Sequence, residues 1–167
     1  KYGKTLTETV YNNRYVGATD TQVAKDMKEN LKIEASEEEI METKDSFYMK
    51  LYKKLEPKEG LIRLLEILKK KKIKTAIASN SSIPTIEGVV DLIKVRSFFD
   101  TFSSAYEVAH GKPAPDVFLY AASKLNVEPE KCLVLEDSPI GILGANKAHM
   151  QSIAVPSIET KNVDFSN

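Results

Sequence analysis

Several features common in proteins are scarce or missing in this sequence of 167 residues. Cys132 is the only cysteine, which excludes an intrachain disulfide and favours a reducing compartment. Basic and acidic residues each number 24, so the net charge is zero and no broad surface for nucleic acid or an anionic membrane is expected. No apolar run approaches the ~18 to 20 residues that span a bilayer, and the start, KYGKTLTETV, lacks a signal-peptide core. We therefore expect a soluble, cytoplasmic protein.

The first third of the chain has the periodicity of helices. Ser36 begins a capping-box pattern, S-x-x-E, and one helical face then carries the apolar residues Ile40, Phe47, Tyr48, Leu51, Tyr52 and Leu55. A second short amphipathic helix is predicted in TDTQVAKDMKENL from the spacing of Val23, Met27 and Leu31. Pro57 and Gly60 interrupt this pattern, so we expect a helical domain over residues 1–55 and a second domain over residues 56–167.

In the second domain, short apolar runs alternate with helical patterns. Helices are predicted in EGLIRLLEILKKKK, SIPTIEGVVDLI, PDVFLYAASKL and PIGILGANKA, and strands in IKTAIAS, CLVL and SIAV. In the first of these helices, the positions expected to face inward are Leu61, Leu64, Leu65 and Leu68. Because each strand is mostly apolar, the alternation indicates an α/β fold in which helices cover a parallel sheet on both faces.

Polar residues gather where two of the predicted strands end. Ser79 and Asn80 follow KTAIA, and Glu136 and Asp137 follow CLVL. Between these two points lies HGKPAPD, in which Lys112 precedes two prolines that would hold the backbone in a defined loop. Because ligands of open α/β sheets bind at the carboxyl ends of the strands, we expect these residues to converge on one site.

These residue types suit the binding of a phosphate and a metal ion. A serine hydroxyl and the N–H groups at a helix start can bind phosphate oxygens, and a lysine adds a positive charge beside them. Paired carboxylates at a strand end suit Mg²⁺. Taken singly, Ser79 could be a helix cap, Lys112 a surface lysine and the two acids favourable residues at a helix start. Their order along the chain favours the phosphate interpretation.

With these motifs, the sequence resembles the haloacid-dehalogenase (HAD) superfamily of phosphatases over nearly its whole length, above all in HGKPAPDVF and CLVLEDSPIGILGA. The resemblance is to the branch with a small helical cap, which includes β-phosphoglucomutase and phosphatases of small sugars and nucleoside monophosphates. It implies a Rossmann-like HAD core, a helical cap formed by the first domain, and Mg²⁺ as the cofactor.

The resemblance also implies roles for individual residues. Ser79, with Asn80 beside it, would hold the transferring phosphate, and Lys112 would neutralise the phosphate and the nucleophile together. Glu136 and Asp137 would surround Mg²⁺, with Asp137 as the more direct ligand. The segment of the cap that faces the substrate would consist of Gly17, Ala18, Thr19 and Asp20.

The sequence departs from the family pattern in its first motif. The family begins with an apolar strand, central in the sheet, that ends in Asp-x-Asp-Gly; its first aspartate is the nucleophile and its second the general acid and base. This motif is absent from the sequence, so we expect the segment to precede Lys1. The family also usually continues with a further strand and helix beyond the C-terminal tail seen here.

A second departure concerns the substrate. Asp20 stands where the mutases carry a basic residue that grips a second phosphate, which favours a phosphatase of monophosphates. His149 replaces the glycine usual in the turn between a helix and a strand, and we expect both His149 and His110 to be structural.

Three functions are therefore considered. The first is a Mg²⁺-dependent phosphatase that acts through an aspartyl-phosphate on a small phosphorylated metabolite, such as a sugar or nucleoside monophosphate. The second is a phosphosugar mutase of the β-phosphoglucomutase type. The third, of another class, is an inactive module that binds phosphometabolites, because losing the nucleophile of an enzyme can cost about a millionfold in rate. No nucleic-acid or membrane partner is expected, while the substrate and the oligomeric state stay open.

Overall fold

The computed structural model describes all residues except 1, 6, 8, 9, 11–14, 16, 17, 53, 54, 158, 159, 162, 166 and 167, and only the backbone of 20, 45 and 48–52. Its helices are α2 (Asp20–Leu31), α3 (Glu37–Tyr52), α4 (Leu61–Lys70), α5 (Ile83–Leu92), α6 (Asp116–Leu125) and α7 (Pro139–Lys147). Its strands are β1 (Ala76–Ser79), β2 (Thr101–Ser104), β3 (Leu133–Glu136) and β4 (Gln151–Ala154). Short 3₁₀ helices are η1 (Arg96–Phe98), η2 (Ala105–Glu107) and η3 (Pro129–Lys131). Within this described part of the chain, no helix has the length and apolar character needed to cross a membrane.

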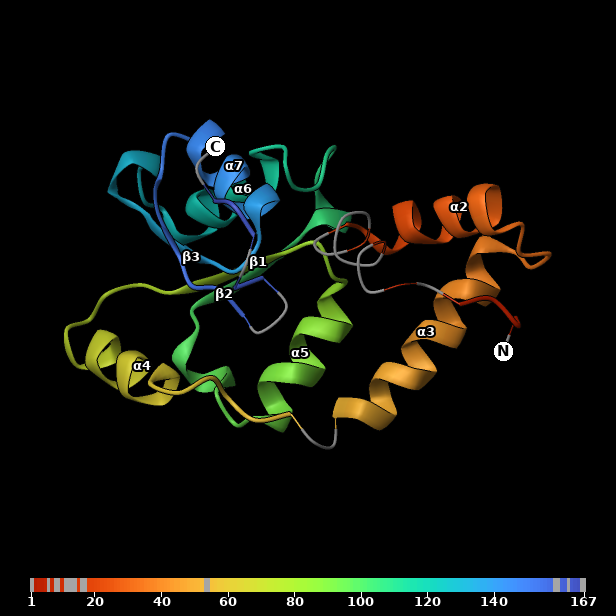
Figure 1. Cartoon of the computed structure of the whole chain (residues 1–167). Coiled ribbons are helices and arrows are strands. Elements are labelled where there is room, and N and C mark those ends of the chain that lie inside the picture. The colour runs from red at the N-terminus through yellow and green to blue at the C-terminus, as the bar shows by residue number, and fades with distance from the viewer. Residues whose placement is uncertain are drawn as a thin grey trace.

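Helices α2 and α3 pack against each other at one side of the molecule (Figure 1). They share a small core in which Ala24, Ile33 and Ile40 are buried. As the capping-box pattern predicts, the Ser36 hydroxyl accepts a hydrogen bond from the backbone N–H of the third residue of α3, at 3.0 Å. Both predicted helices are therefore confirmed.

The expected apolar face of α3 is only partly buried. Ile40 is 5% exposed, but Phe47, which was predicted to lie on the same buried face, is 54% exposed, and Leu55 is 42% exposed. The shared core with α2 includes Ile40 and Met41 near the start of α3, and Phe47 lies beyond it. The prediction for Phe47 and Leu55 was therefore wrong, while Tyr48, Leu51 and Tyr52 lie outside the described side chains.

The four strands form two separate parallel ladders. β1 pairs with β2, so that Ala76 lies opposite Thr101, and β3 pairs with β4, so that Leu133 lies opposite Gln151. The parallel pairing confirms the α/β prediction, and in the described part of the chain no ladder joins the two pairs. β2 was not predicted from the sequence, because its residues TFSS lack the apolar run that marks the other strands.

The first ladder is covered on both faces, as predicted. On one face, Ile77 and Phe102 pack against the core formed by Leu65, Val90 and Val95, which comes from α4, α5 and the residues after α5. On the other face, Ala78 packs against a second core, whose buried members are Val117, Phe118, Ala122, Ala145, Ala148 and Met150. Leu65 is 4% exposed, and the inward face of α4 is confirmed, with its other three leucines half-buried.

The second ladder is covered on one face only. Val134 packs against the core built with α7, whereas its neighbours Leu133 and Leu135 are 56% and 49% exposed. Successive side chains of a strand point to opposite faces, so both leucines lie on the face away from α7. Ile153 of β4 is likewise 50% exposed. The prediction that helices bury both faces of this sheet is therefore wrong for β3 and β4 within the described residues.

The turn from α7 to β4 has the geometry of a Schellman motif. The Met150 N–H donates to the Ala145 carbonyl at 3.1 Å and the His149 N–H to the Asn146 carbonyl at 3.0 Å. His149 itself is left-handed, with φ of 58°, which explains why a glycine is the usual residue at this point.

Replacing His149 with glycine should therefore stabilise the protein. A residue with a side chain pays about 1 kcal/mol for the left-handed conformation, and glycine does not. The free energy of unfolding of His149→Gly, measured in urea, should rise by about 1 kcal/mol. His149→Ala is the matched control, since it removes the imidazole but keeps the strain; an equal gain in this variant would contradict the explanation.

Candidate active site

Asn80, directly after β1, connects that strand to the loop that contains Lys112. Its side-chain oxygen accepts a hydrogen bond from the Lys112 N–H at 2.9 Å, and its amide nitrogen donates to the Lys112 carbonyl at 3.4 Å. The Asn80 amide thus forms hydrogen bonds with both backbone polar groups of Lys112, as the backbone of a neighbouring strand would. Because Asn80 is only 8% exposed, these bonds are shielded from water and fix the position of the lysine backbone.

The side chain of Lys112 forms a buried ion pair with Glu136 at the end of β3. Its Nζ contacts Glu136 Oε1 and lies 4.8 Å from the centre of the Phe118 ring. The two charged side chains are 9% and 7% exposed. Such a pair costs desolvation energy, which its mutual attraction offsets only when the remaining charged atoms also find partners.

Glu136 has those partners in the turn that starts α7. Its second oxygen, Oε2, accepts hydrogen bonds from the Asp137 N–H at 3.0 Å, the Ser138 N–H at 3.1 Å and the Ser138 hydroxyl at 2.9 Å. The Ser138 hydroxyl in turn accepts from the Gly141 N–H at 3.2 Å and caps the helix. Both carboxylate oxygens are therefore engaged, so Glu136 joins Lys112 to the start of α7.

Asp137 has a different environment, although it is the next residue. Its carboxylate is 55% exposed and lies 3.5 Å from the Nζ of Lys58, a side chain that is itself 53% exposed. An ion pair between exposed groups at this distance is weak. Of the two acids, Asp137 thus has the carboxylate that water and a cation can reach. Among the described residues, no group of three or more acidic, histidine or cysteine side chains could hold a metal ion by itself.

Ser79 is the last residue of β1 and begins a turn that leads into α5. Its hydroxyl accepts a hydrogen bond from the Ser81 N–H at 3.1 Å, and the Ser104 hydroxyl donates to the Ser81 carbonyl at 2.7 Å. Ser82 then caps α5 through the Thr85 N–H. Ser79 is half-buried and immediately precedes Asn80, which is bonded to Lys112. The structure therefore joins Asn80, Lys112 and Glu136 by direct contacts, with Ser79 and Asp137 as their chain neighbours.

The pair of helices α2 and α3 approaches the loop around Lys112 at the start of α2. Thr19 caps α2 in a reciprocal pair with Gln22: the Gln22 N–H donates to the Thr19 hydroxyl at 3.2 Å, and the Thr19 N–H donates to the Gln22 side-chain oxygen at 3.0 Å. A Cβ on Gly111 would lie 3.0 Å from the Thr19 methyl and 2.9 Å from the Asn80 oxygen. A glycine before Lys112 thus lets the start of α2 approach the loop. Of the predicted cap residues, Gly17 and the side chain of Asp20 lie outside the described residues.

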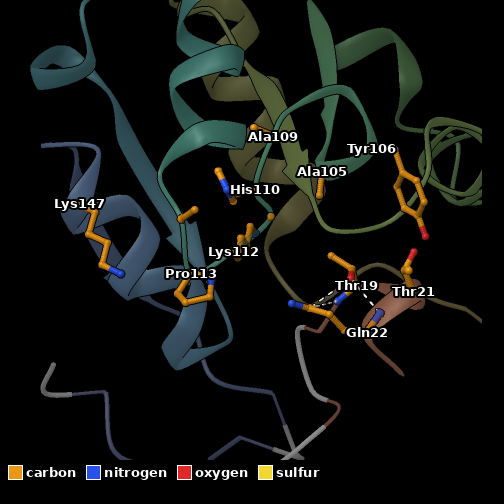
Figure 2. A pocket seen from close by; sticks show the side chains of 12 residues that line it. Thr19, Thr21, Gln22, Ala105, Tyr106, Ala109, His110, Lys112, Pro113 and Lys147 are labelled. Atoms are coloured by element: carbon orange, nitrogen blue, oxygen red, sulfur yellow. Dashed lines mark hydrogen bonds between the residues drawn. The ribbon is translucent and has the colours of Figure 1, made fainter. Parts of the chain in front are cut away.

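A cleft of about 580 Å³ lies between the helices α2 and α3 and the α/β part of the chain (Figure 2). The start of α2 lines one wall, and the loop around Lys112 lines the other. Four polar residues that line this cleft were not predicted from the sequence: Thr21, Gln22, Tyr106 and Lys147. His110 also lines it; its Nδ1 lies 3.3 Å from Asp116 Oδ2, and its backbone N–H donates to the same oxygen at 3.2 Å. These contacts hold the loop at the start of α6.

The model of one family, haloacid dehalogenase-like hydrolase, matches residues 4–149. Hexitol phosphatase B of Escherichia coli (strain K12) is 35% identical over 103 residues, which are 62% of this chain and 46% of the relative. The probable pseudouridine-5'-phosphatase of Drosophila melanogaster is 34% identical over 163 residues, covering 93% of this chain and 69% of that protein. The chain therefore belongs to the haloacid dehalogenase-like hydrolase family, as the sequence motifs indicated. It spans less than half the length of hexitol phosphatase B.

Solved structures agree with the fold. CbbY from Rhodobacter sphaeroides in complex with phosphate has a TM-score of 0.88 at 23% identity, covering 98% of this chain and 76% of that one. The β-phosphoglucomutase from Clostridium difficile has a TM-score of 0.82 at 25% identity, covering 95% of this chain and 73% of that one. These likenesses confirm the HAD-type α/β core.

The close approach of Glu136 to α7 gives a test of the local geometry. A Cβ on Gly141 would overlap the carboxyl group of Glu136. Gly141→Ala should therefore displace that carboxylate and lower the free energy of unfolding by about 1–3 kcal/mol, measured in urea.

Gly88→Ala on α5 is the matched control, because the added Cβ would meet no atom within 4 Å apart from its chain neighbours and the backbone of its own helix. Its stability should stay the same or rise by up to about 1 kcal/mol, since alanine favours helix. A similar loss in both variants would contradict the role given to Gly141.

Proposed function

We propose that this chain is the cap and core of a phosphatase that acts on small phosphorylated metabolites, such as sugar or nucleoside monophosphates. The observation that carries the proposal is the buried Lys112, fixed between Asn80 and Glu136 at the ends of two parallel strands. A lysine with a fixed Nζ supplies a positive charge without any rearrangement, which suits a reaction whose transition state spreads negative charge over phosphate oxygens. The Ser79 hydroxyl would donate a hydrogen bond to an oxygen of the same phosphate.

We assign Asp137 as the protein ligand of Mg²⁺ and Glu136 as the residue that positions Lys112 and the turn. The fit rests on the contrast between the two acids: both oxygens of Glu136 accept hydrogen bonds, while the carboxylate of Asp137 is 55% exposed. Mg²⁺ is typically bound by one or two carboxylates together with water and substrate phosphate, so one reachable carboxylate is compatible with it. When bound, the ion would supply charge neutralisation at the phosphate.

The nucleophile is proposed to come from outside residues 1–167. In the family pattern, an aspartate at the end of a central strand attacks phosphorus, and the bond from phosphorus to the leaving oxygen breaks. The two separate ladders support such a strand, because a central neighbour could pair with both of them and join them in one sheet. If no such strand exists in the protein, the alternative of a phosphometabolite-binding module applies.

We propose that residues 1–55 form the cap and residues 56–167 the core. The separate core of α2 and α3 around Ala24 supports this division. The cleft, which Thr19 and Lys112 both line, would then hold the part of the substrate next to the phosphate. The phosphosugar mutase stays as a second candidate, favoured by the likeness in fold to a β-phosphoglucomutase.

The full-length protein, with the strand that is proposed to supply the nucleophile, is expected to release free phosphate when incubated with Mg²⁺ and a panel of sugar and nucleoside monophosphates. Asp137→Asn should lower this release at least about a hundredfold, since an amide lacks the negative charge that a hard cation requires. Phosphate release and isomerised products are measured in parallel.

Asp91→Asn is the matched control, because it removes an exposed acid of α5 that pairs with Arg96 and should leave turnover unchanged. Isomerisation without free phosphate would favour the mutase, and binding without turnover would favour the binding module. Full activity of Asp137→Asn would remove the metal assignment.

Lys112→Met should lower kcat/KM and also destabilise the protein, by about 3–5 kcal/mol, because Glu136 would be left buried without its partner. The double variant Lys112→Met/Glu136→Gln removes both charges and should regain much of this stability while staying inactive, since the phosphate still lacks its cation. Urea unfolding and steady-state kinetics separate the two effects. Turnover that recovers together with stability would contradict a direct role of Lys112.

A further inference from the structure

Lys58, in the segment between α3 and α4, reaches the ends of both strands of the second ladder. Its Nζ lies 3.5 Å from Asp137 Oδ2, after β3, and donates a hydrogen bond to the Val155 carbonyl, after β4, at 3.4 Å. These contacts connect residues that are far apart in the sequence. The ammonium group of Lys58 thus lies beside the carboxylate to which the proposed function assigns the divalent cation.

The Lys58–Asp137 contact differs from the buried ion pair next to it. Both partners are about half exposed, at 53% and 55%, and the single contact is long, whereas Lys112 and Glu136 are buried and held by several donors. Within the described residues, Lys58 is the only cationic side chain paired with Asp137. A lysine on a flexible stem can leave such a site at little cost, because exposed ion pairs contribute little stability.

We propose that Lys58 is the resident counter-ion of Asp137 and competes with the divalent cation for it. The inference rests on the proposed function, because that function makes Asp137 the metal ligand. A positive charge beside Oδ2 opposes the approach of a second cation, so the lysine must turn away before a metal ion binds. Removing the charge of Lys58 should therefore tighten metal binding, which is the opposite of what loss of a ligand would do.

The test measures the dissociation constant of Mn²⁺, a spectroscopic substitute for Mg²⁺, by electron paramagnetic resonance on the protein without substrate. Lys58→Gln is expected to bind Mn²⁺ about two- to fivefold more tightly, the range that loss of an exposed ion pair allows. Lys70→Gln is the matched control: it removes the same charge from the exposed last turn of α4 and should leave the dissociation constant unchanged. Thermal unfolding checks that each variant is folded.

Asp137→Asn and the double variant Lys58→Gln/Asp137→Asn complete the cycle. Support requires that Lys58→Gln tighten binding in the native background and have no effect once Asp137 is neutral. An unchanged dissociation constant in Lys58→Gln, an equal gain in Lys70→Gln, or an equal gain in the double variant would each overturn the inference. If Asp137→Asn alone binds Mn²⁺ as tightly as the native protein, Asp137 is not the metal ligand. This outcome distinguishes a failure of the metal assignment from a failure of the inference about Lys58.

Discussion

The buried ion pair between Lys112 and Glu136 is the interaction on which the rest of the site depends. Burying two opposite charges is unfavourable unless every charged atom finds a partner, and here the partners come from separate parts of the chain. Asn80 fixes the lysine backbone, while the turn at Ser138 supplies three donors to the glutamate. The pair therefore holds the end of β1, the loop before α6 and the start of α7 in one arrangement.

This arrangement gives two adjacent acids opposite properties. Glu136 is enclosed and engaged on both oxygens, so it acts on Lys112 and on the turn, whereas the carboxylate of Asp137 points to where water can reach it. Adjacent carboxylates at a strand end repel each other when both are charged. Lys112 offsets this repulsion at Glu136 and Lys58 offsets it at Asp137, through one buried and one exposed contact. Of these two contacts, only the second is between exposed groups, and it is therefore the weaker one.

The two ladders differ in how far their faces are covered. β1 and β2 have a core on each face, while β3 and β4 present Leu133, Leu135 and Ile153 on the face away from α7. Apolar residues on both faces of a strand predict burial on both sides, but they do not specify which element provides it. For β3 the described residues supply cover on one side only.

The sequence by itself determined the local features of this protein. The cap at Ser36, the helical pattern that turns the leucines of α4 inward and the polar residues at the ends of β1 and β3 are local features, which a sequence displays directly. Tertiary structure alone decided which of the two acids is enclosed, why Gly141 and Gly111 need no side chain, that Phe47 is exposed, and that Lys58 meets Asp137. These outcomes depend on contacts between residues distant in the sequence, and spacing along a chain contains no information about which distant side chains will share the same space.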